Sequence, residues 1–530
     1  MKRHAWMGMG WVLVLGIAAC GGSGGESDAS RDISADLPGE TDVPATDLPG
    51  TDTARPDTGD QDVPPDGTPP EDTGTVDTVS DEGPDIPWDT LPRLPADKTF
   101  TTPFAAGAGQ ADVSPRTPCY LGGFGFCLGD DTLCRKSDGV HDPLLASAVA
   151  IADTATGDVV ILIGVDTIGL IRKDIESMHR AIQMRLYEDF GVHFPGERAI
   201  ISASHAHSSC DTIGLWGPMG GAGRDEGYTK VLKDGVVQAA RDAFASLQDA
   251  RLEWARGTYQ NSDEDVFADD KDLFVIRGKK PDDTPLFTVI RWPGHPTTYG
   301  DKMHATSADY VGTLRKKMQD EIGGINVFLQ GPIGSVYPER PSTCGLEEEA
   351  FPEGDRTKTD MNPADYMKVT CTGYAVAQVA IDALQNPTPV EENGIDFWHA
   401  SFFFHPDNEV LMMLAEFGPL PYDWVDVNDP DAKMRSIFSV ARIGNLTFVS
   451  TPGEAFPVFA QMAKDTATEA GLPTPITLGL AQDWMGYLLN LEQWQDINLS
   501  YHQSLSPGKE VYSFYQQALR QTLNLPPLSE

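Results

Sequence analysis

Two patterns of apolar and polar positions divide residues 96–530 into predicted strands and helices. Short apolar runs rich in β-branched residues predict buried strands, and "LLASAVAIAD" and "DVVILIGVD", joined by "TATG", predict a hairpin. Apolar positions that recur every three or four residues predict amphipathic helices. The predicted helices cover residues 171–190, 228–247, 310–322, 365–385, 456–470 and 510–523.

Strand patterns dominate the rest of this region. They are "AIISAS", "LEWARGTY", "LFVIRG", "LFTVIRW", "INVFLQ", "FWHASFFF", "EVLMMLAEF", "FSVARI", "LTFVS" and "ITLGLA". Many strands with helices scattered among them predict a mixed α/β fold. Its large sheet core, as one sheet or two stacked sheets, would be flanked by helices. The sequence shows no repeat and no boundary inside residues 96–530, which we therefore expect to form one domain.

The first 20 residues have the pattern of a bacterial secretion signal. Lys2 and Arg3 precede the apolar run "WVLVLGIAA", and Cys20 follows it. "IAAC" resembles a lipobox, in which Cys20 is lipidated and becomes the mature N-terminus. A plain signal peptide or a short membrane anchor are the alternatives. We therefore expect a lipid-anchored protein of the bacterial cell envelope that faces the periplasm or the exterior.

Residues 21–95 have the composition of a disordered linker. They are rich in Asp, Pro, Thr and Gly, and segments this poor in apolar residues cannot offset the entropy cost of ordering. We predict a stalk between the lipid anchor and the domain. The net charge of −40 also argues against a nucleic-acid partner, since such proteins carry basic surfaces.

Six cysteines remain when Cys20 is set aside. An even number in a protein outside the cytoplasm predicts up to three disulfides, but the sequence does not give their pairing. The six are Cys119, Cys127, Cys134, Cys210, Cys344 and Cys371.

Two histidines two residues apart follow a predicted strand in "ISASHAHSS". Residues i and i+2 of a strand face the same side, so His205 and His207 could bind one metal ion. They could equally be ordinary polar residues at a strand end.

Three more residues that can bind metal follow predicted strands and turns. They are His295 in "GHPTTYG", Glu454 in "STPGEAF" and Tyr487 in "LAQDWMGY". Each has an ordinary structural interpretation: a loop histidine, an acid in the first turn of a helix and a core aromatic. All three share one arrangement, in which an apolar strand and a sharp turn are followed by a side chain that can bind metal. This arrangement is typical of sites at the rim of a sheet.

Several blocks resemble the neutral/alkaline, non-lysosomal ceramidase family, in its N-terminal catalytic domain. "ISASHAHSS" resembles the family's "SATHTHSG", "GHPTTYG" its "HPT" block, "STPGEAF" its "VPGEFT" and "LAQDWMGY" its "N-x-Y-x-x-Y". "AAGAGQADVSP", "YLGGFG" and the predicted hairpin resemble the family's opening. The blocks keep the family's order across residues 104–490.

The resemblance implies a zinc site and a set of residue roles. In the family, Zn²⁺ is held by residues that correspond to His205, His295, Glu454 and Tyr487. His207 would contact substrate or move a proton, and Asp309 in "SADY" would support the ligands or be a plain loop carboxylate. Zinc would polarise an amide or ester carbonyl and activate a water for attack.

The sequence departs from the family near the bond to be cleaved. The family's catalytic serine corresponds to Tyr337 in "QGPIGSVYPER". Ser335 could replace it after a local shift, or be a loop serine. An arginine of the family's "NRSP" block is missing from "YQNSDED", and a C-terminal immunoglobulin-like domain is not expected.

These features predict a surface-anchored zinc hydrolase of a linear amide, such as an N-acyl (sphingo)lipid. Its partners would be a small-molecule or lipid substrate and a membrane held through Cys20. One alternative is a non-catalytic relative that binds a lipid, glycan or protein in the cleft that corresponds to the family's active site. Tyr337 at the position of the family serine favours this alternative. The other is a zinc esterase.

Overall fold

A computed structural model describes residues 86–528, apart from 126–133, 219–222, 264–268, 342, 347–360, 410 and 413–433. The predicted signal peptide with Cys20, and the predicted linker as far as residue 85, lie outside the described residues. Residues 88–95, the end of the predicted linker, contact the domain: the Trp88 ring lies 5.4 Å from that of Tyr187, between centroids. None of the helices in the described ranges is long and apolar enough to cross a bilayer.

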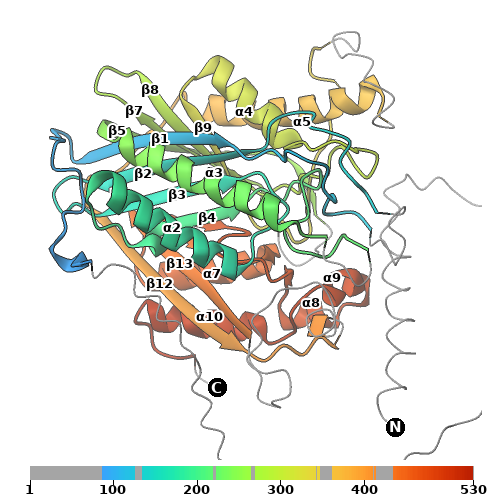
Figure 1. Ribbon diagram of the computed structural model, residues 1–530. Helices are drawn as coiled ribbons and strands as arrows, with labels where there is room; N and C mark the ends of the chain where they lie inside the picture. Colours follow the sequence, from blue (N-terminus) through green and yellow to red (C-terminus); the bar gives the residue numbers. More distant parts are fainter. Residues whose placement is uncertain are drawn as a thin grey trace, which may run out of the picture. The chain divides into compact units, whose positions relative to one another are not determined.

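The larger sheet has nine strands (Figure 1). Eight lie in the order β4-β3-β2-β1-β5-β7-β8-β9, and β11 pairs with β5. The pairs β3–β4 and β8–β9 are parallel. Their bounds are β1 Phe104–Asp112, β2 Leu145–Asp153, β3 Val159–Val165, β4 Ala199–Ala203, β5 Gln248–Thr258, β7 Asp272–Lys279, β8 Pro285–Trp292, β9 Ile325–Gln330 and β11 Thr388–Pro389.

A second sheet and two short ladders complete the strands. The second sheet has the order β12-β13-β14-β16, and the ladders are β6–β10 and β15–β17. The bounds are β6 Asn261–Asp263, β10 Val336–Pro338, β12 Ile395–Phe404, β13 Met434–Ile443, β14 Leu446–Ser450, β15 Glu454–Ala455, β16 Pro475–Leu478 and β17 Tyr487–Leu488.

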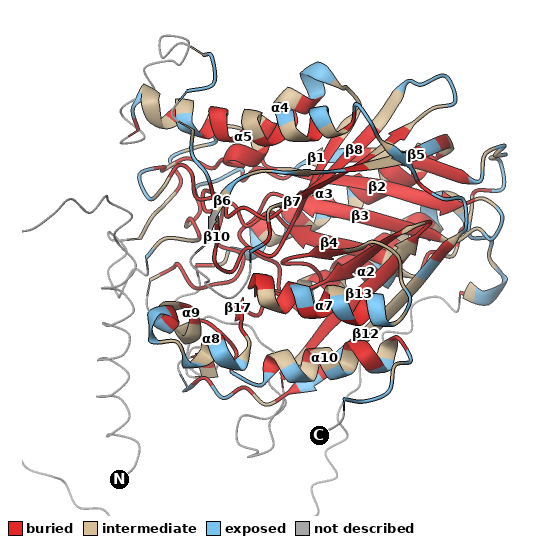
Figure 2. Ribbon diagram, turned by 180° about the vertical axis from the view of Figure 1, so that it is seen from behind, coloured by how far each residue is buried: buried red, intermediate tan, exposed pale blue. Residues whose placement is uncertain are grey.

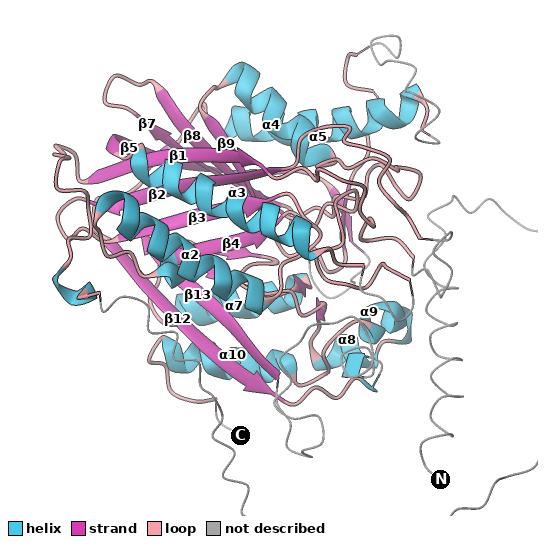
Figure 3. Ribbon diagram, viewed as in Figure 1, coloured by secondary structure: helices cyan, strands magenta, loops and turns pink. Residues whose placement is uncertain are grey.

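Pairs of helices cover the outer faces of three sheet sections (Figure 3). α2 and α3 pack on β1–β4, α4 and α5 on β5, β7, β8 and β9, and α7 and α10 on the second sheet. The helices are α2 Arg172–Phe190, α3 Glu226–Ala245, α4 Tyr310–Glu321, α5 Pro363–Ala383, α7 Pro457–Glu469, α8 Leu491–Gln495, α9 Ser500–Ser504 and α10 Val511–Thr522, with 3₁₀ turns η1 Trp88–Thr90, η3 Gly196–Arg198 and η5 Ile497–Leu499.

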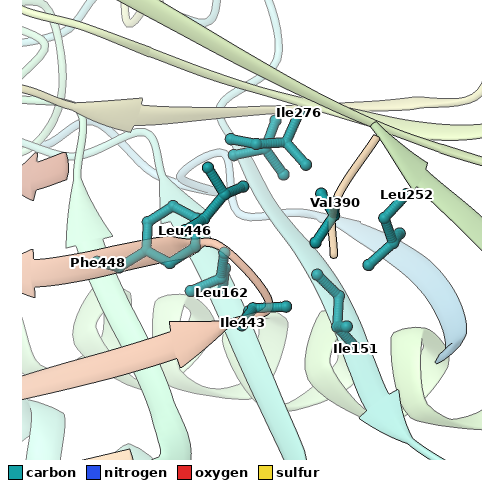
Figure 4. A pocket seen from close by; sticks show the side chains of 9 residues that line it. Ile151, Leu162, Leu252, Ile276, Val390, Ile443, Leu446 and Phe448 are labelled. Carbon is teal, nitrogen blue, oxygen red and sulfur yellow. The ribbon is translucent and has the colours of Figure 1, made fainter. Parts of the chain in front are cut away.

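The inner faces of the three sections meet in one apolar core. Figure 2 shows β2, β3 and β4 buried while the covering helices expose one side. A small cavity remains at the centre, and only apolar side chains line it (Figure 4). These are Ile151, Leu162, Leu252, Ile276, Val289, Val390, Ile443, Leu446 and Phe448. Each fully buried side chain of this kind contributes about 1.5–3 kcal/mol, which makes this junction a main source of stability.

The larger sheet curls so that its two edge strands, β4 and β9, lie in contact. The approach is close, because a Cβ on Gly164 in β3 would lie 2.0 Å from the carbonyl oxygen of Phe328 in β9. The curl brings together the ends of β4 and β8. His205 follows the first of these strands and His295 follows the second.

The predicted mixed α/β fold is confirmed, as are the hairpin β2–β3 and all six predicted helices to within a few residues. The strand predicted at 409–417 is wrong where it is described. Met412 N donates to Asn408 O at 3.0 Å, which is a helical hydrogen bond. The sequence patterns also missed β1, because "FAAGAGQAD" is poor in β-branched residues.

Candidate metal centre

Three buried imidazoles lie together at the ends of β4 and β8. The ring centroids of His205, His207 and His295 are 4.7–4.9 Å apart. One nitrogen of each ring lies within 4.8 Å of the other two. The predicted HxH pair is therefore joined by a histidine that is almost 90 residues away in sequence, through the curl of the larger sheet.

Backbone carbonyls orient two of the three rings. His205 Nδ1 donates to Ile168 O at 2.5 Å, and His295 Nδ1 donates to Ile333 O at 3.2 Å. With Nδ1 protonated, Nε2 carries the free lone pair, as is usual for a metal-binding histidine. His207 differs, since its Nδ1 has no hydrogen-bond partner among the described residues and its Nε2 lies 3.1 Å from His295 Nε2.

Glu454 faces these histidines from the β15–β17 ladder, which also carries Tyr487. The two residues are direct partners in that parallel ladder. Glu454 Oε1 accepts a hydrogen bond of 3.0 Å from Trp484 Nε1. Glu454 Oε2 has no hydrogen-bond partner in the described part of the chain, and lies 3.2 Å from His205 Nε2 and 3.8 Å from His295 Nε2.

Burial and mutual charge set the protonation of this cluster. Burial, with the neighbouring His205, lowers the pKa of His295 to about 3. Burial alone would raise the pKa of Glu454, but the imidazoles of His205 and His295 lower it to about 2. The site thus combines an ionised carboxylate with a neutral imidazole, the forms that bind metal. Burial and the Glu454 carboxylate raise the pKa of Tyr487, so the phenol keeps its proton unless a cation is bound.

The loop that carries the HxH pair is held in an unusual conformation. His205 has φ of 67°, a region that side chains rarely adopt. A disulfide between Cys119 and Cys210 fixes the end of the loop. Gly123 lies directly against His207, where a Cβ would be 2.2 Å from the ring. Such strain persists only where the surrounding structure holds it, as it does at many functional sites.

Tyr337 lies over His295, at the position predicted for the family serine. The two rings are stacked, with centroids 5.3 Å apart and planes at 16°. Ser335 is fully buried. The backbone of this loop supports His295, because Val336 O accepts from His295 N at 3.0 Å.

Asp309 lies one step away from the cluster. Its carboxylate accepts hydrogen bonds from Tyr299 N at 3.0 Å and Tyr310 N at 2.6 Å. It thereby fixes the start of α4 to the loop that follows His295. Burial raises the pKa of Asp309. These contacts are with Tyr299 and Tyr310, so support of the ligands by Asp309 stays a prediction.

Two residues near the cluster were missed in the sequence. Trp484 holds Glu454, and the ring of His502 lies 4.6 Å from that of Tyr487, between centroids. Trp484 lies in the same "LAQDWMGY" block as Tyr487, and a donor three residues before a predicted ligand was the available signal. His502 comes from α9, where no pattern marked it.

The predicted ligands fit a zinc ion in their chemistry. Two buried nitrogens with oriented lone pairs and one unpartnered carboxylate oxygen converge, and zinc prefers such nitrogen and oxygen donors.

The disulfide prediction is supported by two pairs in the described ranges, Cys119–Cys210 and Cys344–Cys371, and Cys134 is also disulfide-bonded.

No protein-family model and no curated protein matches this sequence. Solved structures do match it. A crystal structure of neutral ceramidase from Pseudomonas aeruginosa is similar with a TM-score of 0.61 and 16% identity, over 81% of this chain and 76% of that one. A ceramidase complexed with C2 has a TM-score of 0.59 and 16% identity, over 81% and 77%. The described part of this chain therefore has the fold of the neutral ceramidases.

Proposed function

We propose that this protein is a zinc-dependent hydrolase of a linear amide bond. The observation that carries the proposal is the orphan oxygen Glu454 Oε2, which faces two histidine nitrogens that backbone carbonyls have oriented. A buried carboxylate oxygen without a hydrogen bond costs free energy unless a cation satisfies it. His205, His295, Glu454 and Tyr487 would hold the ion.

The chain's own residues have separate tasks around that ion. Zinc, when bound, supplies a Lewis acid and an activated water. Trp484 fixes the Glu454 carboxylate through Oε1 and leaves Oε2 for the ion. His207 holds or passes a proton near the scissile bond, since no backbone carbonyl fixes its tautomer in the described structure. The ring of Phe124 packs edge to face against His207, with centroids 4.7 Å apart.

An N-acyl lipid is the first substrate class to test. Its support is the fold shared with two structures that are named as ceramidases. We further propose that Cys20 is lipidated and that residues 21–95 tether the enzyme at the cell envelope. The support for this is the basic start, the apolar run and "IAAC" in the sequence.

A panel of N-acyl lipids, short acyl amides and acyl esters, each with and without a chelator, tests the activity. We expect amide cleavage that the chelator removes and zinc restores. Cleavage of esters alone would favour the zinc esterase. Lipid binding without turnover in zinc-loaded protein would favour the non-catalytic relative, whose support is Tyr337 stacked on His295.

A further inference from the structure

A buried glutamine joins the two loops that carry His205 and His295. Gln330 is the last residue of β9 and is fully buried. Its Nε2 donates to Ser204 O at 2.6 Å and to Gly294 O at 3.2 Å. Ser204 directly precedes His205, and Gly294 directly precedes His295. One amide group therefore spans the two backbones that present these histidines.

The amide can take only one orientation. Gln330 Oε1 accepts from Gly331 N at 3.0 Å, so the oxygen already faces a donor. Turning the amide over would place this oxygen against two carbonyl oxygens and the NH₂ group against an N–H. Both amide protons are thus used, one on each loop.

The same residue also reaches the segment that leads to Glu454. The carbonyl oxygen of Gln330 accepts from Gly479 N at 2.9 Å, and Leu480 N donates to Gly453 O at 3.0 Å. The C-terminal end of β9 is therefore where the three ligand-bearing segments meet.

We propose that Gln330 is a positioning residue that sets the separation of His205 and His295 for metal binding. The inference rests on the proposed zinc site. A metal site needs its ligand atoms placed within a few tenths of an ångström, and loops set such distances only when their backbones are tied. His205 needs this more than most ligands, because its backbone has an unfavourable φ of 67°.

Zinc affinity of the full chain, measured by competition with a chromophoric chelator, tests the proposal. Gln330→Met removes both hydrogen bonds with little change of shape, and Gln330→Glu turns the donor into an acceptor. We expect zinc affinity to fall by about 10-fold or more in both, the range for groups that orient ligands. When cobalt replaces zinc, the visible spectrum of both variants should differ from that of the wild type. Gln330→Asn keeps a donor on a shorter side chain and should recover part of the affinity.

Asn326 gives a matched control at the other end of β9. Its buried carboxamide accepts from Thr288 Oγ1 and donates to Gln319 Oε1. Asn326→Leu should lower thermal stability as Gln330→Met does, yet leave zinc affinity within about twofold. Wild-type affinity and an unchanged cobalt spectrum in Gln330→Met or Gln330→Glu would overturn the inference. A wild-type chain that binds no zinc would overturn the proposed function instead.

Discussion

Among the described residues, two groups of neighbouring histidines differ in whether they have the geometry of a metal site. The candidate metal centre consists of His205, His295, Glu454 and Tyr487. The other cluster, the histidine network, consists of His179, His399, Ser439 and Gln482. In the network, His179 Nε2 donates to Ala199 O at 2.9 Å and His399 Nδ1 lies 2.9 Å from Ser439 Oγ. Among the described residues, the side chains grouped closely enough to hold a metal ion are His205, His207 and His295, and neither His179 nor His399 belongs to that group.

The comparison shows which property separates a site from a structural network. Burial lowers the pKa of His179 to about 3, as burial and His205 do for His295. A depressed histidine pKa therefore does not identify the site. The distinguishing property is where the second nitrogen points. In the metal centre it faces an unpartnered carboxylate oxygen, and in the network the polar atoms satisfy one another.

Metal content should separate the two clusters with the largest effect. We expect about one zinc per chain in the wild type, and a loss of zinc affinity of more than about 100-fold in His205→Ala or Glu454→Ala, since each removes a proposed ligand. Elemental analysis after dialysis measures this. His179→Gln should retain the metal. Zinc retained in both ligand variants would place the ion elsewhere.

The dependence of stability on pH should distinguish the histidine network from the candidate metal centre with the second-largest effect. The pKa of His179 is about 3 in the folded protein and about 6.5 in the unfolded chain. Between these two pH values, the His179 imidazole is protonated in the unfolded chain and neutral in the folded protein, which favours unfolding. Its contribution is fully present above pH ~6.5 and is lost as the pH falls towards ~3. Urea unfolding of metal-free protein at several pH values should show this slope.

His179→Leu removes the titrating group and should make that slope shallower. It should also lower the free energy of unfolding by about 1–3 kcal/mol at neutral pH, because Ala199 O loses its donor. An unchanged slope would mean that other groups dominate the acid sensitivity.

Sequence patterns marked His205, His295 and Glu454, which the fold brings together, but not the contacts that orient them. His205, His295, Glu454 and Tyr487 each follow a strand or turn, and a family pattern marked all four. The orienting carbonyls of Ile168 and Ile333 could not be predicted, since any residue type has a carbonyl and only the fold aims it.

Strand β1 was missed for a related reason. A Cβ on Gly107 or Gly109 would lie 2.3 Å from a carbonyl oxygen of α3, so these positions need glycine to let the helix approach. Packing selected glycine where strand propensity would favour a β-branched residue. Tertiary contact thus removed the local signal, whereas β2 and β3, which keep their branched side chains, were predicted from the pattern.

Substitution of Trp484, which donates a hydrogen bond to Glu454, should have an intermediate effect on zinc affinity. Trp484→Phe removes the 3.0 Å hydrogen bond to Glu454 Oε1 and keeps an aromatic ring, so zinc affinity should fall by about 10-fold. Trp292→Phe is a matched control, since Trp292 is also fully buried but its Nε1 has no partner in the described ranges. Equal affinities in the two variants would show that the tryptophan hydrogen bond does not position the carboxylate.

Ring stacking at the metal centre should have the smallest effect. Tyr337 lies parallel to His295, at 16°, whereas the rings of His179 and His399 meet edge to face at 79° with centroids 6.1 Å apart. A stacked aromatic pair contributes about 0.5–1.5 kcal/mol, part of which fixes the plane of the His295 ring. Tyr337→Ala should therefore weaken zinc binding by about threefold. Tyr337→Phe keeps the stacked ring and should bind zinc as the wild type does, measured by chelator competition. A loss in Tyr337→Phe equal to that in Tyr337→Ala would assign the effect to the hydroxyl group, and the stacking would then contribute nothing to the difference between the two clusters.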